Sequence, residues 1–197
     1  MRSVQEEFLI TFFKNLRKGS VYNRKWWNPL SLSIYLHDII ASEQIQNVIE
    51  LGTGNGVSAT WMALGGANVW TCDTTVRPKV WEDENFPLPH IANRILAFEI
   101  EADKFLRANA HSGPTPTIKS SELFFLDAAT SEKSFRRDMK VVADVAEEDD
   151  IIVAPIGHSE IYNCWLKMAG AGFKVFINSS TESFTLKWPN DGNLRAW

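Results

Sequence analysis

The segment Val48–Ser58, VIELGTGNGVS, constrains the fold of this chain more than any other. It begins with apolar residues that surround Glu50, as at the end of a buried strand. Three glycines follow at alternate positions, where they allow backbone angles and close approaches that a Cβ would forbid. The residues after them, up to Leu64, favour a helix that Gly65 and Gly66 would end. A ligand lying on such a turn would meet backbone N–H groups and a helix N-terminus.

Strands and helices alternate along most of the chain, which is typical of an α/β sheet with helices on both faces. Residues 74–90 contain three prolines and are expected to form a loop with at most a short helix. No crossover helix separates the last two expected strands, so these two must pair antiparallel. Beyond the glycine segment, we expect strands at 68–73, 94–100, 123–127, 151–155, 172–177 and 183–188, and helices at 4–18, 31–40, 103–110, 131–147 and 159–169.

Composition narrows the class of protein. The 197 residues are 45% hydrophobic, enough for one domain with a sizeable core, and their net charge of −4 argues against a dedicated nucleic-acid binder. Cys72 and Cys164 lie far apart without metal-ligand spacing, so we expect reduced, buried thiols. No apolar run approaches the ~20 residues of a membrane span, and the acidic residues after Met1 do not fit a signal peptide. We therefore expect a cytoplasmic protein that does not enter a membrane.

Four acidic residues follow or end expected strands: Glu50, Asp73, Asp103 and Asp127. In an open α/β sheet, ligands bind outside the carboxyl ends of the strands. Asp73 ends the strand after the glycine turn, where nucleotide-binding folds place the acid that bonds ribose hydroxyls. Each of the four could instead be an ordinary solvated acid, and Asp127 could instead cap the helix that follows it.

Glu50 to Gly56, ELGTGNG, resembles the first motif of class I S-adenosylmethionine-dependent methyltransferases, acid-x-Gly-x-Gly-x-Gly. A dehydrogenase fingerprint would need its third glycine at position 57, which is Val57, and does not usually carry an acid before its first glycine. The methyltransferase cofactor has a sulfonium, an ammonium and no pyrophosphate, so acids near the turn suit it. The resemblance covers roughly residues 45 to 188. It implies a three-layer Rossmann-like α/β sandwich whose seven-stranded sheet is mostly parallel and has an antiparallel C-terminal strand pair.

The resemblance also implies a division of the chain and a set of cofactor residues. A methyltransferase domain, 45–197, would follow an N-terminal helical and aromatic cap segment, 1–44. Glu50 would organise the cofactor's amino group directly or through water, Asp73 would bind the ribose, and Asp103 would contact the adenine. The residues expected to bind S-adenosylmethionine are Glu50, Gly52, Thr53, Gly54, Asn55, Gly56, Asp73, Asp103 and Asp127.

Asp127 would also lie where the methyl group and its acceptor meet. An acceptor hydroxyl would need a base, and the candidates are Asp127 and His158. His158 could equally be a helix-start residue without a catalytic contact. The likeness is strongest to the small-molecule branch, so we expect a small-molecule acceptor.

The chain departs from several branches of the family. A divalent metal needs several oxygen ligands, and Asp127 is followed by Ala128 and Ala129, so we expect no metal. The Asn/Asp-Pro-Pro-aromatic tetrapeptide of amino-methylating enzymes is missing after Asp127, and no Pro-Cys pair offers the nucleophile of the cytosine-C5 enzymes. These departures exclude the commonest DNA-methylating branches, and we expect no nucleic-acid partner.

Alternatives stay open at this point. The chain could be a non-catalytic cofactor-binding or assembly protein of the same fold, or a nicotinamide-dependent enzyme. RNA methylation has support only from the basic pairs before Trp26 and Trp27. The segment with these two tryptophans could form a lid over the acceptor, or the tryptophans could simply fill one end of the core. Trp81 is also left open as a binding residue. The oligomeric state is undetermined, with a homodimer as one alternative.

Overall fold

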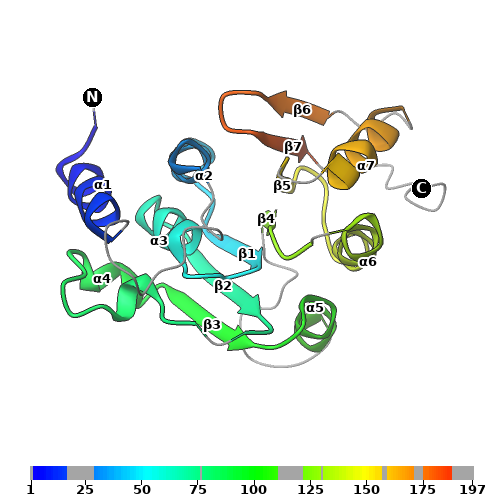
Figure 1. Cartoon of the computed structure of the whole chain (residues 1–197). Coiled ribbons are helices and arrows are strands. Elements are labelled where there is room, and N and C mark those ends of the chain that lie inside the picture. Colours follow the sequence, from blue (N-terminus) through cyan, green and yellow to red (C-terminus); the bar gives the residue numbers. More distant parts are fainter. Residues whose placement is uncertain are drawn as a thin grey trace.

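The structure is a computed structural model that describes residues 2–16, 29–75, 77–110, 122–129, 131–156, 159–170 and 175–187. Within them, seven strands form one sheet in the order β3-β2-β1-β4-β5-β7-β6 (Figure 1). Strands β1 to β5 pair in parallel, whereas β7 is antiparallel to both β5 and β6, as the missing crossover helix predicts. The strands are β1 Asn47–Leu51, β2 Asn68–Asp73, β3 Ile95–Glu99, β4 Leu123–Leu126, β5 Ile151–Pro155, β6 Val175–Asn178 and β7 Ser183–Lys187.

Helices cover both faces of the sheet, which confirms the predicted three-layer Rossmann-like architecture. Figure 1 shows α1 to α4 on one side of the sheet and α5 to α7 on the other. The first group is α1 Val4–Leu16, α2 Leu30–Glu43, α3 Val57–Leu64 and α4 Pro89–Ala92, with the 3₁₀ turn η2 Val80–Glu82 before α4. The second group is α5 Ala102–Ala110, α6 Glu132–Ala143 and α7 Ser159–Gly170.

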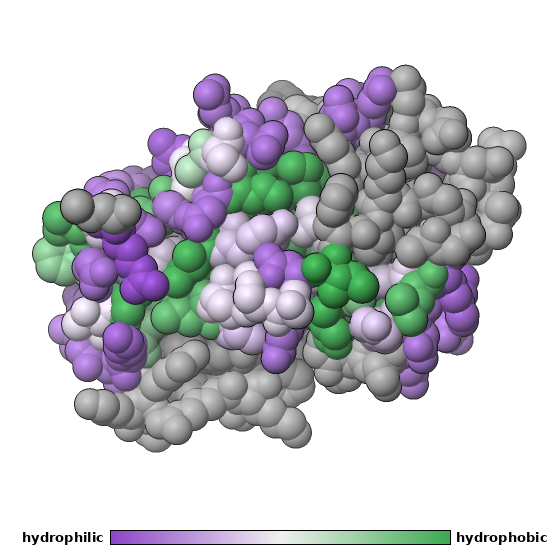
Figure 2. All heavy atoms as spheres, turned by 90° about the horizontal axis from the view of Figure 1, so that it is seen from above, coloured by the Kyte–Doolittle hydropathy of each residue, from purple (hydrophilic) through white to green (hydrophobic). Residues whose placement is uncertain are grey.

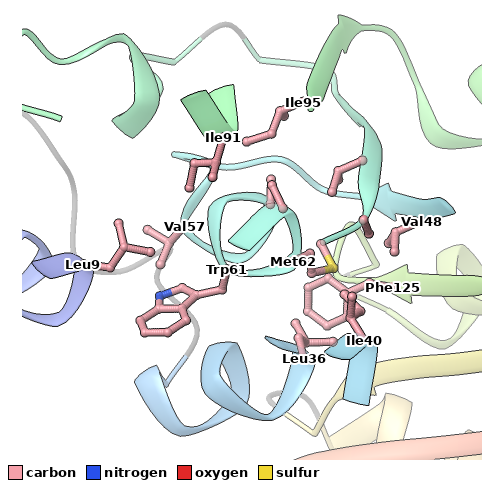
Figure 3. Close-up of a cluster of buried hydrophobic side chains, with 14 of the residues drawn as sticks. Leu9, Leu36, Ile40, Val48, Val57, Trp61, Met62, Ile91, Ile95 and Phe125 are labelled. Atoms are coloured by element: carbon pink, nitrogen blue, oxygen red, sulfur yellow. The ribbon is translucent and has the colours of Figure 1, made fainter. Parts of the chain in front are cut away.

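Helix α3 is the centre of one hydrophobic core (Figure 3). Trp61 is completely buried and points toward Leu9 of α1, while Met62 points toward Phe125 of the sheet and Ile40 of α2. The N-terminal helices therefore pack into the same core as the helix that follows the glycine turn. Truncating a buried Trp of this kind costs about 3–5 kcal/mol. The division into segments 1–44 and 45–197 stays a prediction.

Helix α6 covers the opposite face and is shorter than the sequence pattern indicates. Ser131 caps it, with its Oγ accepting the Ser134 N–H at 3.3 Å, and Phe135 is fully buried beneath it. The prediction that the helix runs to residue 147 is wrong, because α6 ends at Ala143. Four acidic residues at 147–150 follow the helix, and negative charge is unfavourable at a helix C-terminus.

Among the described residues, the exposed large apolar side chains are Val4, Phe8, Leu96, Phe98, Tyr162, Leu166 and Ile177. On the face drawn in Figure 2, hydrophobic groups reach the surface in small patches between hydrophilic ones. Among the helices that the structure describes, none is long and apolar enough to cross a membrane.

Candidate functional site

A small pocket lies at the carboxyl end of β1, between the glycine turn and the end of β4. Its cavity volume is about 20 Å³, close to the space of one water molecule. The residues that line it are Gly52, Thr53, Gly54, Asn55, Val57, Ser58 and Asp127. The structure thus brings together five of the predicted cofactor residues, and adds Val57 and Ser58, which were not among them.

The glycine turn needs its glycines for backbone geometry and for space. Gly52, Gly54 and Gly56 have φ angles of 101°, 53° and 80°, in the left-handed region. A Cβ on Gly52 would lie 2.7 Å from the backbone nitrogen of Ala128, so this glycine lets the turn touch the chain just after β4. That contact is what places Asp127 on the pocket wall.

Four backbone N–H groups of the turn form hydrogen bonds within the protein. The amides of Gly52 and Thr53 both donate to the Cys72 carbonyl, at 2.8 and 3.1 Å. The Gly54 amide donates to Asp73 Oδ2 at 2.9 Å, and the Gly56 amide donates to the Thr53 carbonyl at 2.7 Å. A phosphate cradle needs such amides free to face the ligand. These four amides are already used, which favours a ligand without a pyrophosphate.

Glu50 lies under the turn and is completely buried. Ser58 Oγ donates to its Oε1, and Thr71 Oγ1 donates to its Oε2 at 2.5 Å. Register explains Thr71, because β1 and β2 pair in parallel with Glu50 beside it. Glu50 does not line the pocket, whereas its partner Ser58 does, so Ser58 lies between the carboxyl and the pocket.

The electrostatic setting of Glu50 favours its neutral form. Burial above all, with a smaller contribution from the nearby charge of Asp127, raises its pKa from 4.5 to about 8. The two hydroxyl donors and the Lys79 ammonium act in the opposite direction. A cationic ligand in the pocket would reverse this balance, because a nearby positive charge favours the carboxylate.

Asp73 ends β2 beside the glycine turn. Its Oδ2 accepts the Gly54 N–H, and its Oδ1 accepts the Thr75 N–H at 3.0 Å. Each carboxylate oxygen has a second lone pair for another donor. The carboxylate is therefore held in one orientation next to the turn, as a ribose-binding acid requires.

A second loop, Pro78 to Glu82, holds the turn from outside, and we call it the clasp. Lys79 Nζ donates to the Gly54 carbonyl at 3.0 Å, and burial lowers the pKa of this ammonium while Asp73 opposes the shift. The Val80 amide donates to the Asn55 carbonyl at 3.0 Å, and Asn55 Nδ2 donates to the Pro78 carbonyl at 3.1 Å.

The clasp also packs an aromatic ring on the turn. A Cβ on Gly56 would lie 2.0 Å from Cζ3 of Trp81. Trp81, left open by the sequence, thus has a packing role against the third glycine. Nothing in the local pattern of residues 74–90 indicated that Lys79 and Trp81 would reach the turn.

Four of the predicted site residues do not line the pocket: Glu50, Gly56, Asp73 and Asp103. Asp103 lies in the first turn of α5, where its Oδ1 is 3.9 Å from Arg137 Nη1 of α6. Its contact with adenine stays a prediction. The proposed base His158 and the aromatic segment with Trp26 and Trp27 lie outside the described residues. Ser131 caps α6, so Asp127 does not have that alternative role.

A group of metal-type side chains occurs elsewhere, on α1 and α2. Glu6, His37 and Asp38 have potential ligand atoms within 4.8 Å of one another. Glu6 forms a reciprocal pair of hydrogen bonds with Ser3 at the start of α1, and His37 Nδ1 is 2.9 Å from Asp38 Oδ1. These contacts account for the three side chains as local helix contacts, and none of the three lines the pocket.

Neither a protein-family model nor a curated protein sequence matches this chain. A candidate O-methyltransferase of Klebsiella pneumoniae superposes with a TM-score of 0.66 at 15% identity, covering 93% of this chain and 90% of its own. A methyltransferase of Podospora anserina with S-adenosylhomocysteine bound has a TM-score of 0.62 at 16% identity, with 92% and 88% covered. An rRNA methylase of Streptococcus thermophilus has a TM-score of 0.52 at 13% identity, with 78% and 93% covered. Likeness at such identities is one of fold, and the chain therefore has the Rossmann-like fold of class I S-adenosylmethionine-dependent methyltransferases.

Proposed function

We propose that this protein is a metal-independent, cytoplasmic methyltransferase that transfers the methyl group of S-adenosylmethionine to a small molecule. One observation carries the proposal: the amides of Gly52, Thr53, Gly54 and Gly56 are used internally, while Asp73 and Asp127 stand at the turn. Such a site suits a cationic ligand without phosphates better than a dinucleotide. The bound structures of the same fold support the choice of cofactor.

The described residues fit the parts of this cofactor. The turn and Ser58 would hold its methionine part, and Asp73 its ribose hydroxyls. S-adenosylmethionine supplies an electrophilic methyl group for in-line displacement. The protein contributes proximity and alignment, which can supply several kcal/mol of the barrier. Asp127 lies on the pocket wall, where it would accept a proton from an acceptor hydroxyl; His158 is the other candidate base.

Isothermal titration with S-adenosylmethionine, S-adenosylhomocysteine and NAD tests the cofactor. We expect both sulfur nucleosides to bind and NAD not to bind. Asp73→Ala should weaken S-adenosylhomocysteine at least about tenfold. Glu43→Gln removes one exposed negative charge on α2 and should leave the affinity unchanged. Binding of NAD alone, or of no ligand, would overturn the proposal.

A second candidate function is cofactor binding without catalysis. It is favoured by the chain after Asp127, where Ala128 and Ala129 offer no acid or base. Transfer of a labelled methyl group to any member of a panel of small hydroxyl and amine acceptors would exclude it. An rRNA fragment belongs in the same panel, because an rRNA methylase shares the fold. We expect no transfer to RNA, since the chain carries a net charge of −4.

A further inference from the structure

Three hydroxyl groups connect Glu50 with the pocket. Ser58 Oγ and Thr71 Oγ1 bond its two carboxyl oxygens, and Thr53 Oγ1 lies 2.7 Å from Thr71 Oγ1. Ser58 and Thr53 line the pocket, whereas Glu50 and Thr71 are completely buried. We call these four side chains the hydroxyl relay, because it runs from a buried carboxyl to the pocket at two points.

Counting hydrogens fixes the direction of each bond when Glu50 is ionised. A carboxylate only accepts, and each hydroxyl has one hydrogen. Ser58 and Thr71 must then give their hydrogens to Glu50, so Thr53 must give its own to Thr71. No hydroxyl hydrogen is left for the pocket. Ser58 and Thr53 can offer a ligand only lone pairs.

A proton on Glu50 changes this result. The relay then holds four hydrogens for three internal contacts, so one hydrogen has no internal acceptor. The surplus appears at Ser58 or at Thr53, depending on which oxygen of Glu50 is protonated. The wall of the pocket then presents a donor and repels a ligand group that also donates.

We propose that Thr71 and Ser58 are positioning residues for the ligand. Because an ionised Glu50 takes up their hydrogens, the pocket wall presents only hydrogen-bond acceptors and thereby selects a ligand bearing a hydrogen-bond donor. In S-adenosylmethionine that donor is the ammonium group, so the inference rests on the proposed function. It adds that the ligand enters with release of one proton from Glu50.

The charged surroundings are consistent with a bound proton in the free protein. Burial and the Asp127 charge raise the pKa of Glu50 to about 8, against the Lys79 ammonium of the clasp. On β2, Cys72 and Asp73 are the neighbouring titratable groups, and burial raises the pKa of the Cys72 thiol to about 12. Cys72 is therefore neutral near pH 7, and Glu50 is the group of the relay that can lose a proton there.

Two ligands separate this inference from the proposed function. S-adenosylhomocysteine and 5′-methylthioadenosine share the nucleoside and the thioether, but only the first carries the ammonium. Calorimetric titration near pH 7 in phosphate and in Tris gives the protons released, since these buffers differ in ionisation enthalpy. We expect about one proton for S-adenosylhomocysteine and none for 5′-methylthioadenosine.

Variants of the relay test the residues. Thr71→Val removes one donor to Glu50 and frees the Thr53 hydrogen, so it should weaken S-adenosylhomocysteine at least about tenfold and 5′-methylthioadenosine by less than about threefold. Thr71→Ser keeps the hydroxyl and should restore the affinity. Glu50→Gln has a permanent extra donor, so it should show the same selective loss and release no proton.

The outcomes divide clearly. Equal proton release for the two ligands, or an equal loss of both affinities in Thr71→Val, would overturn the inference and leave the proposed function standing. A merely structural role of Thr71 predicts such an equal loss. If neither ligand binds the unaltered protein, the proposed function fails and takes the inference with it.

Discussion

The ring of Trp81 occupies the space that a side chain at position 56 would need, since a Cβ there would lie 2.0 Å from Cζ3. Gly56 also has a φ of 80°, a conformation that L side chains rarely adopt. The third glycine of the motif does not line the pocket, so its described role is to receive the clasp. The motif suggests that each of its glycines contacts the ligand, but Gly56 instead leaves room for the ring of Trp81 to pack.

Gly56→Ala should therefore lower the free energy of unfolding by about 2–4 kcal/mol, because it adds a clash to a strained φ. Trp81→Leu removes the clashing ring and should recover part of the loss in the double variant, while the φ strain remains. Urea denaturation of the two single variants and the double variant gives the coupling. Strictly additive losses would mean that the ring does not cause the clash.

Gly52→Ala should lower the free energy of unfolding more than Gly66→Ala does. The new Cβ at Gly52 would lie 2.7 Å from Ala128 N, a backbone atom that cannot swing away. Gly66 has a φ of 113° with nothing within 4 Å of its Cβ position, so Gly66→Ala should cost only the φ strain, about 1–2 kcal/mol.

Both variants can be followed by thermal unfolding and by S-adenosylhomocysteine titration. We expect Gly52→Ala to lose affinity as well as stability, because relief of the clash must move Asp127. Gly66→Ala should keep its affinity. Equal affinities in the two variants would show that the contact between the turn and the end of β4 does not shape the pocket.

Much of the fold was predictable because its signals are local. Alternating apolar segments, the proline-rich loop and the absence of a crossover helix before β7 each indicate one element or one pairing. The positions of the turn and of Asp73 were predictable for the same reason, since both lie at the end of a strand, and their contacts with a cofactor stay predictions. The end of α6 was missed because Val145 and Ala146 keep the apolar spacing beyond the last helical residue.

The parts of the site that escaped prediction depend on contacts between distant segments. Thr71 looks like an ordinary strand residue, and only the register of β1 and β2 places it beside Glu50. Lys79 reaches Gly54 across 25 positions without a local signal. Asp103 obeys the same end-of-strand rule as Asp73, yet its neighbour in the structure is Arg137.

Stability should depend on pH through Glu50. Its pKa is about 8 in the folded protein and 4.5 in the ordinary carboxyl, so the folded state binds the extra proton. The contribution to stability is fully present below pH 4.5 and is lost as pH rises through 8, with a slope of at most about 1.4 kcal/mol per pH unit. Glu50→Gln cannot ionise and should lack this loss.

Urea denaturation of both proteins from about pH 6.5 to about pH 9 measures the difference. This range lies above the pH values at which Asp138 and Asp150 titrate, because burial raises the pKa of each carboxyl group to about 6. We expect the unaltered protein to lose stability relative to Glu50→Gln as pH rises. A constant difference would mean that the buried carboxyl does not titrate there.

Replacing Lys79 should weaken cofactor binding without lowering the free energy of unfolding. Its ammonium holds the Gly54 carbonyl, and the Gly54 amide is held by Asp73, so one peptide is fixed on both sides. Burial lowers the pKa of Lys79, which means that folding disfavours its charge. Lys79→Met keeps the aliphatic stem and removes that charge, so the free energy of unfolding should stay unchanged or rise.

Cofactor binding should nevertheless suffer, because the Gly54 peptide loses one of its two anchors beside the ribose-binding acid. We expect S-adenosylhomocysteine to bind at least about tenfold more weakly, a loss of about 1.4 kcal/mol or more. Lys140→Met, an exposed change of the same charge on α6, is the matched control and should bind normally. If Lys79→Met lost stability and affinity in proportion, Lys79 would support the fold of the clasp rather than the geometry of the turn.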